Sequence, residues 1–127
     1  MFEKLEITRM AQALAAHAGA RQSTVAQNVA QADTPGYKAM DLPDFATSYQ
    51  AASSSGMRAT RPGHVAAAGQ MLEPVLEPSG GEASPDGNTV SLAREMVKSV
   101  DARQQHDMAL SIYRATSEIV RTSLGRR

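Results

Sequence analysis

The sequence predicts a mainly α-helical fold: paired long N- and C-terminal helices, coiled-coil-like, with an irregular central loop region containing short β-strands. Three observations support this fold class. Residues 33–88 contain all six prolines and seven of the nine glycines, whereas residues 3–32 and 89–124 together contain only Gly19. Both ends of the chain carry apolar side chains at helical spacing. Aromatic residues make up only 4% of the chain and alanine is abundant, which favours close helix packing over a thick core.

The N-terminal segment is expected to form one long helix. Pro35 disfavours the helical conformation at Thr34, so this helix should end near Ala32 or Asp33. Its apolar stripe advances by three, four or seven residues at a time and comprises Ile7, Met10, Leu14, Ala18, Val25, Val29 and Ala32.

The C-terminal segment carries two apolar stripes. We expect its helix to be capped by Asn88 or Thr89 and to stop at Gly125. Since one partner helix covers only one side, the second stripe indicates a further partner. The first stripe is Ala93, Val97, Val100, Gln104, Met108, Ile112, Ala115 and Ile119, and the second is Leu110, Tyr113, Ser117, Val120 and Leu124. The residues expected to serve helix packing and assembly are therefore Ile7, Met10, Leu14, Val25, Val29, Val97, Val100, Met108, Leu110, Ile112, Tyr113, Ile119, Val120 and Leu124.

The middle of the chain is expected to be a separate part. We assign residues 1–33 and 89–127 to a terminal helical domain and residues 34–88 to a central region of loops and short strands. Residues 57–60, 64–66 and 70–76 are the candidate strands. Residues 77–88 have almost nothing to bury, which predicts a mobile segment.

Composition argues against several classes of function. The 13 basic and 13 acidic residues balance, so neither nucleic acid nor an anionic membrane surface is an expected partner. The absence of cysteine excludes disulfides and thiolate chemistry, and there is no apolar run long enough to span a bilayer. The mixed-charge start lacks the features of a secretory signal peptide, so we expect export without a cleaved signal.

No catalytic or metal-binding pattern is visible. His17, His64 and His106 have no second ligand at a suitable spacing and are expected on polar faces or loops. Asp41 and Asp44 lie in a proline-containing loop and are expected to be solvated. We therefore predict no enzyme activity, no cofactor, no metal and no small-molecule substrate.

One segment, residues 27–39, combines a helix end with a turn. Pro35 presets the first central position of a type II turn, and Gly36 supplies the positive φ that the second position needs. Asn28 and Asp33 have short polar side chains that can bond the nearby backbone, and Tyr37 offers a ring with a polar tip. On the residues alone, an ordinary helix-to-loop turn explains this segment.

This segment also resembles the N-terminal signature of the flagellar axial proteins, the rod and hook family. Gln31 departs from that signature, where asparagine is usual. Residues 60–65 and 87–96 are similar to later elements of the family, and the short chain with Phe45 soon after the motif is most similar to a proximal rod member. The matching residues are Asn28, Val29, Ala30, Ala32, Asp33, Thr34, Pro35, Gly36, Tyr37 and Lys38.

The resemblance implies a structural rod subunit that is exported by the flagellar type III apparatus and assembles in the basal body to transmit torque. It implies as partners copies of the chain itself, other rod proteins (FlgC and a FlgF-like protein), the adaptor FliE and the MS ring. Two alternatives stay open at this point: another axial protein of the rod such as FlgC, or a helical adaptor or export chaperone. We also expect low helicity in the dilute monomer, rising on assembly, because isolated helices are marginal.

Overall fold

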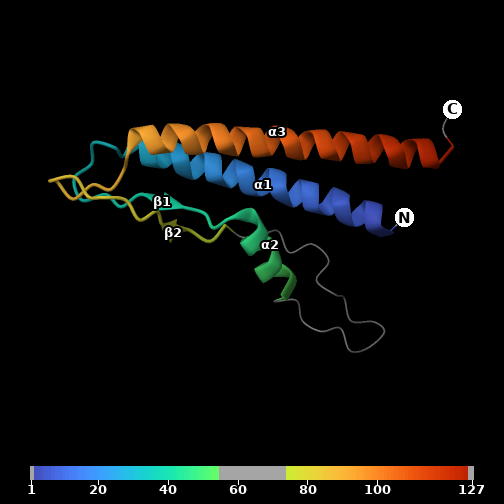
Figure 1. Cartoon of the computed structure of the whole chain (residues 1–127), viewed down its shortest axis with the longest axis horizontal. Helices are drawn as coiled ribbons and strands as arrows, with labels where there is room; N and C mark the ends of the chain where they lie inside the picture. Colours follow the sequence, from blue (N-terminus) through green and yellow to red (C-terminus); the bar gives the residue numbers. More distant parts are fainter. Residues whose placement is uncertain (1, 55–73, 126–127) are drawn as a thin grey trace.

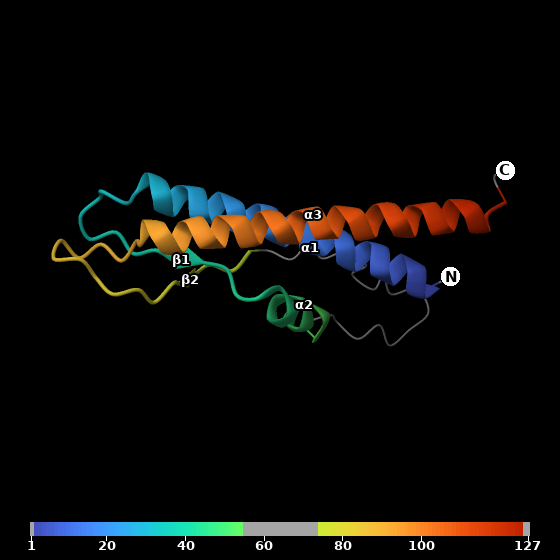
Figure 2. The same cartoon turned by 45° about the horizontal axis from the view of Figure 1, so that its top comes forward.

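The computed structural model describes residues 2–54 and 74–125. Two long helices dominate it: α1 (Phe2–Ala30) and α3 (Leu92–Ser123). They run antiparallel and side by side, so the N- and C-terminal ends lie at the same end of the molecule (Figures 1 and 2). At 1.5 Å per residue each helix is on the order of 45 Å long. The predicted fold class, with paired terminal helices and short central strands, is confirmed.

Small residues form the seam between the two helices. Ala18, Ala102 and Ala109 are each only 1% exposed. A set of buried positions recurs every seven residues on each helix, which is the spacing of a coiled coil. They are Ala11, Ala18 and Val25 on α1, and Glu95, Ala102, Ala109 and Thr116 on α3.

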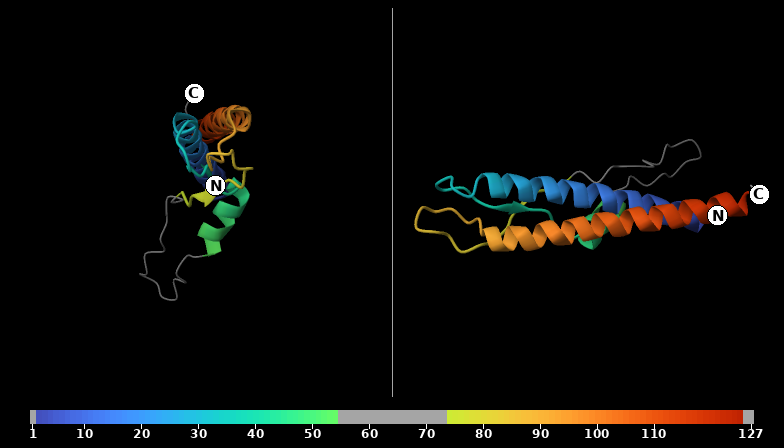
Figure 3. Two further views of the ribbon diagram at one scale, coloured as in Figure 1. Left: turned by 90° about the vertical axis from the view of Figure 1, so that its left-hand side faces the viewer. Right: turned by 90° about the horizontal axis from the view of Figure 1, so that it is seen from above.

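The remaining described elements cover one side of this helix pair. Strands β1 (Met40–Asp41) and β2 (Glu77–Pro78) pair antiparallel in the register Met40 to Pro78 and Asp41 to Glu77. Helix α2 (Phe45–Ser54) follows β1 and was not expected from the sequence. An end-on view shows α2 and the strands on the same side of α1 and α3 (Figure 3, left).

Several sequence expectations for the middle of the chain need correction. The candidate strands at 57–60 and 64–66, and the first part of 70–76, lie outside the described residues. Within 74–76 there is no strand; the strand is at 77–78 instead. The predicted mobile segment 77–88 lies along residues 36–41, where the Ser79 N–H donates to the Ala39 carbonyl over 2.8 Å. Backbone pairing, rather than apolar burial, holds it there.

The helix ends differ slightly from those expected. Helix α1 ends at Ala30, two residues early, and turn structure follows. Helix α3 begins after Ser91, so Asn88 and Thr89 are not its caps. Gly125 has a φ of 72° directly after the helix, as its predicted role as a stop requires.

Candidate functional site

The motif segment folds around the side chain of Asn28, which is fully buried. Its amide nitrogen donates to the Met40 carbonyl (2.7 Å) and to a carboxylate oxygen of Glu95 (3.0 Å). Its amide oxygen accepts from the Met40 N–H (3.1 Å) and from the hydroxyl of Tyr37 (3.2 Å). All four hydrogen-bonding positions of the amide are therefore used, and one side chain joins α1 to Tyr37, to β1 and to α3.

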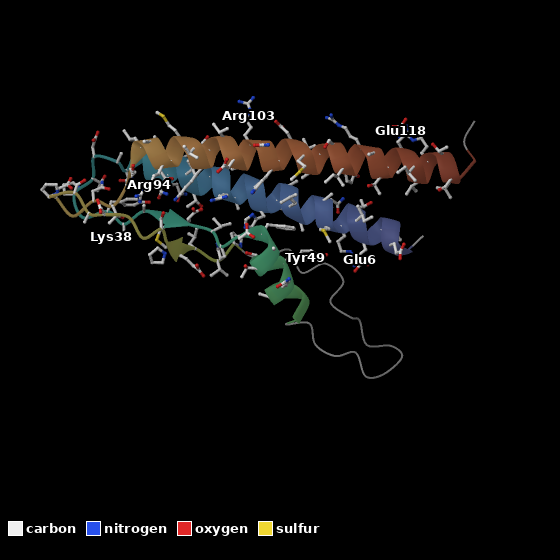
Figure 4. The ribbon with its side chains drawn as sticks, viewed as in Figure 1. Glu6, Lys38, Tyr49, Arg94, Arg103 and Glu118 are labelled. Atoms are coloured by element: carbon white, nitrogen blue, oxygen red, sulfur yellow. The ribbon has the colours of Figure 1, made fainter. Side chains whose placement is uncertain are left out.

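The turn after α1 has the geometry that its residues predict. Gly36 has a φ of 73°, a conformation that L side chains rarely adopt. Its N–H donates to the carbonyl of Asp86 over 2.9 Å, and the Lys38 ammonium donates to the carbonyl of Gly87 over 3.0 Å. Lys38 lies at the end of the molecule opposite the chain termini, which we call the turn end (Figure 4). The turn is thus tied to the connection that leads into α3.

Asn88, in the connection that leads into α3, also bonds the backbone at the end of α1. Instead of capping α3, its amide nitrogen lies within 3.0 Å of the carbonyl oxygens of Gln31, Ala32 and Thr34. These carbonyls lie just beyond α1 and have no partner within the helix. The side-chain oxygen of Asn88 accepts from the N–H of Val90. The sequence predicted that Asn88 caps α3, whereas its side chain bonds carbonyls at the end of α1. The prediction was wrong because this contact joins residues more than fifty positions apart in the chain.

The other motif residues divide by exposure. Tyr37 is half-buried and bonds Asn28, whereas Val29, Ala30, Asp33 and Pro35 are exposed. Thr34 is also exposed, and its hydroxyl donates to the side chain of Gln31 over 2.6 Å.

Four charged side chains lie together beside Asn28. Asp41 accepts from Arg21 (3.1 Å) and pairs with Lys98 (3.0 Å), and Lys98 also pairs with Glu95 (3.1 Å). Glu95 is only 2% exposed. Two cations balance two anions here, so neither carboxylate is left buried without a partner. We call Arg21, Asp41, Glu95 and Lys98 the ionic cluster; it connects α1, β1 and α3.

The pKa of Asp41 is lowered below its ordinary value of 3.8. Burial by itself raises the pKa of this carboxyl, but hydrogen bonds from Arg21, Lys98 and the Leu42 N–H, with the charge of Arg21, lower it further than burial raises it. The expectation that Asp41 is solvated is therefore wrong, because strand β1 places it between α1 and α3.

His17 is also buried, at 6% exposure, contrary to the expectation of a polar-face residue. Its Nε2 lies 2.9 Å from the carbonyl of Pro43 and donates to it in the matching tautomer. The ring meets the ring of Phe45 edge-on at 5.7 Å, and Phe45 packs against Tyr49 at 5.4 Å. These contacts hold α2 against α1.

The residues predicted for packing and assembly are mostly not those in the seam. Val25 lies in the seam, and Leu14, Leu110 and Val120 are half-buried. Val97 and Val100 are 61% and 65% exposed, so the first predicted stripe of α3 does not face α1. Small side chains occupy the seam because they let the backbones of the two helices approach closely. The remaining predicted residues are exposed: Ile7, Met10, Val29, Met108, Ile112, Tyr113, Ile119 and Leu124.

Across 2–54 and 74–125, no group of three or more histidine, aspartate or glutamate side chains is placed to hold a metal ion. None of the helices in these ranges is both long and apolar enough to cross a membrane.

Comparison with known proteins identifies relatives over most of the chain. The chain is 31% identical over 120 residues to flagellar basal body rod protein FlgB of Agrobacterium fabrum, covering 89% of this chain and 88% of the relative. It is 36% identical over 101 residues to FlgB of Escherichia coli and to FlgB of Shigella flexneri, with 72% of each chain covered. No family model matches the chain. These relatives favour a rod protein over an adaptor or an export chaperone. The chain belongs to the family of the flagellar basal body rod protein FlgB.

Proposed function

We propose that this chain is a non-enzymatic structural subunit of the proximal rod of the bacterial flagellum, and that it assembles through its paired terminal helices. The observation that carries the proposal is a helix pair that leaves large apolar side chains exposed along α3. The family supports the same conclusion, since the relatives are named as rod proteins of the flagellar basal body.

The exposed apolar side chains supply a driving force for assembly. Each square ångström of apolar surface removed from water contributes about 25 cal/mol. Val97, Val100 and Ile119 lie outside the seam, so burying them needs another molecule. Contacts between different surfaces of successive copies generate an open helical array when the rotation from copy to copy does not close into a ring. A tube made of packed helices is stiff, which suits transmission of torque.

Residues 1–33 and 89–127 form the inner helical layer of the axle, and residues 34–88 lie outside it. The partners are copies of the chain, FlgC and a FlgF-like rod protein, the adaptor FliE and the MS ring. The subunit reaches the periplasmic rod through the flagellar type III apparatus without a cleaved signal peptide.

Charge substitutions on the exposed apolar surface test this function. Val29→Asp and Ile112→Asp place a charge where a neighbour is expected to pack, and an unpaired buried charge costs several kcal/mol. In a motile bacterium in which this chain replaces the native subunit, we expect each variant to abolish swimming and to be absent from purified basal bodies.

The matched control is Arg103→Ala, which changes a side chain that points away from α1 (Figure 4). We expect this variant to swim and to copurify with basal bodies. Absence of the unmodified chain from basal bodies would refute the proposed function, and normal swimming by both charged variants would refute the assigned surface.

A further inference from the structure

Helix α2 is joined to α1 near its first turn. The ring of His17 in α1 meets the ring of Phe45 edge-on at 5.7 Å, and Phe45 packs against Tyr49 at 5.4 Å. The His17 Nε2 lies 2.9 Å from the carbonyl oxygen of Pro43, two residues before Phe45. From this contact α2 leads away from α1 and α3 (Figures 1 and 3). One imidazole ring thus makes both a polar and an aromatic contact between α1 and the start of α2.

The hydrogen bond to Pro43 requires one form of the imidazole ring. A carbonyl oxygen only accepts, so Nε2 carries the hydrogen, and Nδ1 carries none while the ring is neutral. Among the described residues, the Nδ1 of His17 is buried and has no hydrogen-bond partner, and the whole residue is 6% exposed. A proton added to Nδ1 would create a buried N–H without an acceptor on a charged ring, which is unfavourable.

The charged groups of α1 and of the β1 region give Nδ1 no acceptor. Arg21 lies one turn further along α1 and carries the same charge as a protonated histidine. Asp41 in β1 is already paired with Arg21 and Lys98. Asp44 follows Pro43 directly, but its carboxylate is exposed and accepts no hydrogen bond from the ring.

Helices α2 and α3 give Nδ1 no acceptor either. Tyr49 is the only titratable side chain of α2, and its ring packs on Phe45. Helix α3 packs on the seam of α1, and the residues that flank its buried Ala102 are Asp101 and Arg103, which are opposite in charge and exposed. The attached position of α2 therefore suits the neutral ring.

We propose that this contact is a proton-sensitive latch: the neutral ring of His17 holds α2 against α1, and uptake of a proton releases α2. A histidine in water takes up a proton near about pH 6.5, and the ring is in water once α2 is released. Because the released form then binds the proton more readily than the attached form, mild acid favours release. From pH 7.5 to pH 5, the ratio of released to attached chains rises by up to about thirtyfold. The latch operates within one chain and does not depend on the proposed rod function.

Distances between spin labels measure the position of α2. The chain contains no cysteine, so the labels react only with introduced cysteines. Gln12→Cys in α1 with Thr47→Cys in α2 is the latch pair, and Gln12→Cys with Arg103→Cys in α3 is the reference pair; all three positions are exposed. Labelled chains are diluted into unlabelled chains, at a total concentration at which circular dichroism shows the helices to be formed.

The other two histidines are removed first. In a background with His64→Gln and His106→Gln, His17 is the only histidine. By double electron–electron resonance, we expect the latch pair to give one narrow distance at pH 7.5 and an additional broad component at pH 5. The ratio of the broad to the narrow component should rise about tenfold or more. The reference pair is expected to stay narrow at both pH values, because the seam between α1 and α3 does not contain this ring.

Two substitutions identify the group that takes up the proton. His17→Gln keeps an N–H that can donate to Pro43 but cannot become charged, so we expect the latch pair to give the same distances at both pH values. Loss of the response supports the latch whether α2 is attached or released in this variant. Asp44→Asn removes the carboxylate next to Pro43 and is expected to change the response by less than about twofold.

Any of four results would overturn the latch. The first is a ratio that rises by less than about threefold between pH 7.5 and pH 5 in the single-histidine background. The second is an equal response in His17→Gln, and the third is loss of the response in Asp44→Asn. The fourth is a reference pair that broadens together with the latch pair, which would show a general loosening of the fold.

Discussion

At the scale of single residues, Asn28 connects three parts of the chain through one buried side chain. A helix residue ordinarily contacts its neighbours three and four positions away, but Asn28 bonds Tyr37, Met40 and Glu95. A buried amide with all its hydrogen bonds made specifies one register between the helices, because any slip leaves several polar groups unpaired. Asn28 therefore aligns α1 with α3.

Asn28→Asp tests this role. The substitution keeps the shape but removes the two N–H donors and places a second carboxylate beside Glu95. We expect the free energy of unfolding to fall by about 3 kcal/mol, measured by denaturant titration. Gln27→Glu, the same type of change on the exposed neighbouring residue, is the control and should change it by less than about 0.5 kcal/mol. Equal effects of the two substitutions would contradict the role of Asn28.

Asp41 makes the free energy of unfolding depend on pH in the acidic range. Its pKa is lowered in the folded state, so the folded chain binds its proton less readily than the unfolded chain. The stabilisation is complete above the ordinary value of 3.8 and is lost as pH falls through the lower folded pKa.

We expect the free energy of unfolding to fall on acidification below about pH 4, and Asp41→Asn to reduce this dependence. At neutral pH the same variant should be less stable, because Arg21 and Lys98 lose their shared partner. Unfolding titrations from pH 6 to pH 2.5 measure both effects. Asp101→Asn, on an exposed part of α3, should leave the acid dependence unchanged; an equal effect there would exclude a special role for Asp41.

At the scale of elements, the seam between α1 and α3 depends on residue size. Ala102 and Ala109 are almost completely buried, while larger apolar side chains of α3 lie outside. A short side chain brings the helix axes close, and polar side chains then bond across the seam, as Gln22 and Ser99 do over 2.9 Å. The larger apolar side chains of α3 stay exposed, and the proposed function has neighbouring subunits cover them.

Ala102→Leu tests the close approach. The added volume has no space in the seam, and overpacking of this kind costs about 1–3 kcal/mol. We expect a lower melting temperature by circular dichroism at fixed protein concentration. Ala93→Leu introduces the same side chain at an exposed position near the start of α3 and should melt like the parent. If Ala102→Leu melted like the parent, the two helices would have to pair more loosely than the structure indicates.

The connections at the turn end form a second unit of contacts. Gly81 illustrates their closeness: a Cβ there would lie 2.6 Å from the carbonyl oxygen of Thr89. The Ala39 N–H donates to the hydroxyl of Thr89 over 2.8 Å, and the Thr89 N–H donates to the Tyr37 carbonyl over 3.0 Å. Although these loops bury little apolar surface, their hydrogen bonds position both helices.

At the scale of the whole molecule, the helix pair is an elongated body with a thin core. A seam of alanines buries little apolar surface, and much of the apolar surface of α3 remains in contact with solvent. Stability then depends on protein concentration, because partners bind only the folded chain.

We expect the helicity of the chain to be low in dilute solution and to rise with concentration, together with the melting temperature. Circular dichroism over a hundredfold range of concentration measures both quantities. The variant Ile112→Asp should remove the rise, because it blocks a surface used in assembly. A parent chain that melts sharply at one temperature throughout that range would show that the single copy is stable alone.

The sequence by itself determined the two long helices and the turn that follows the first of them. Prolines and glycines are confined to the middle, and helical periodicity extends over both ends, so local propensity alone specifies these elements. The positive φ of Gly36 was also predictable from the sequence, because it depends on the local turn and not on contacts with distant residues.

Only the tertiary structure decided which side chains meet. The apolar stripe of α3 predicted contact through Val97 and Val100, yet the seam selected Ala102 and Ala109, because close approach rewards small residues over large ones. Asn88 bonds carbonyls more than fifty residues away, and Asp41 joins Arg21 to Lys98 across three elements. Contacts between segments so distant in the chain leave no periodic pattern in either segment, and they form only once the two helices lie side by side.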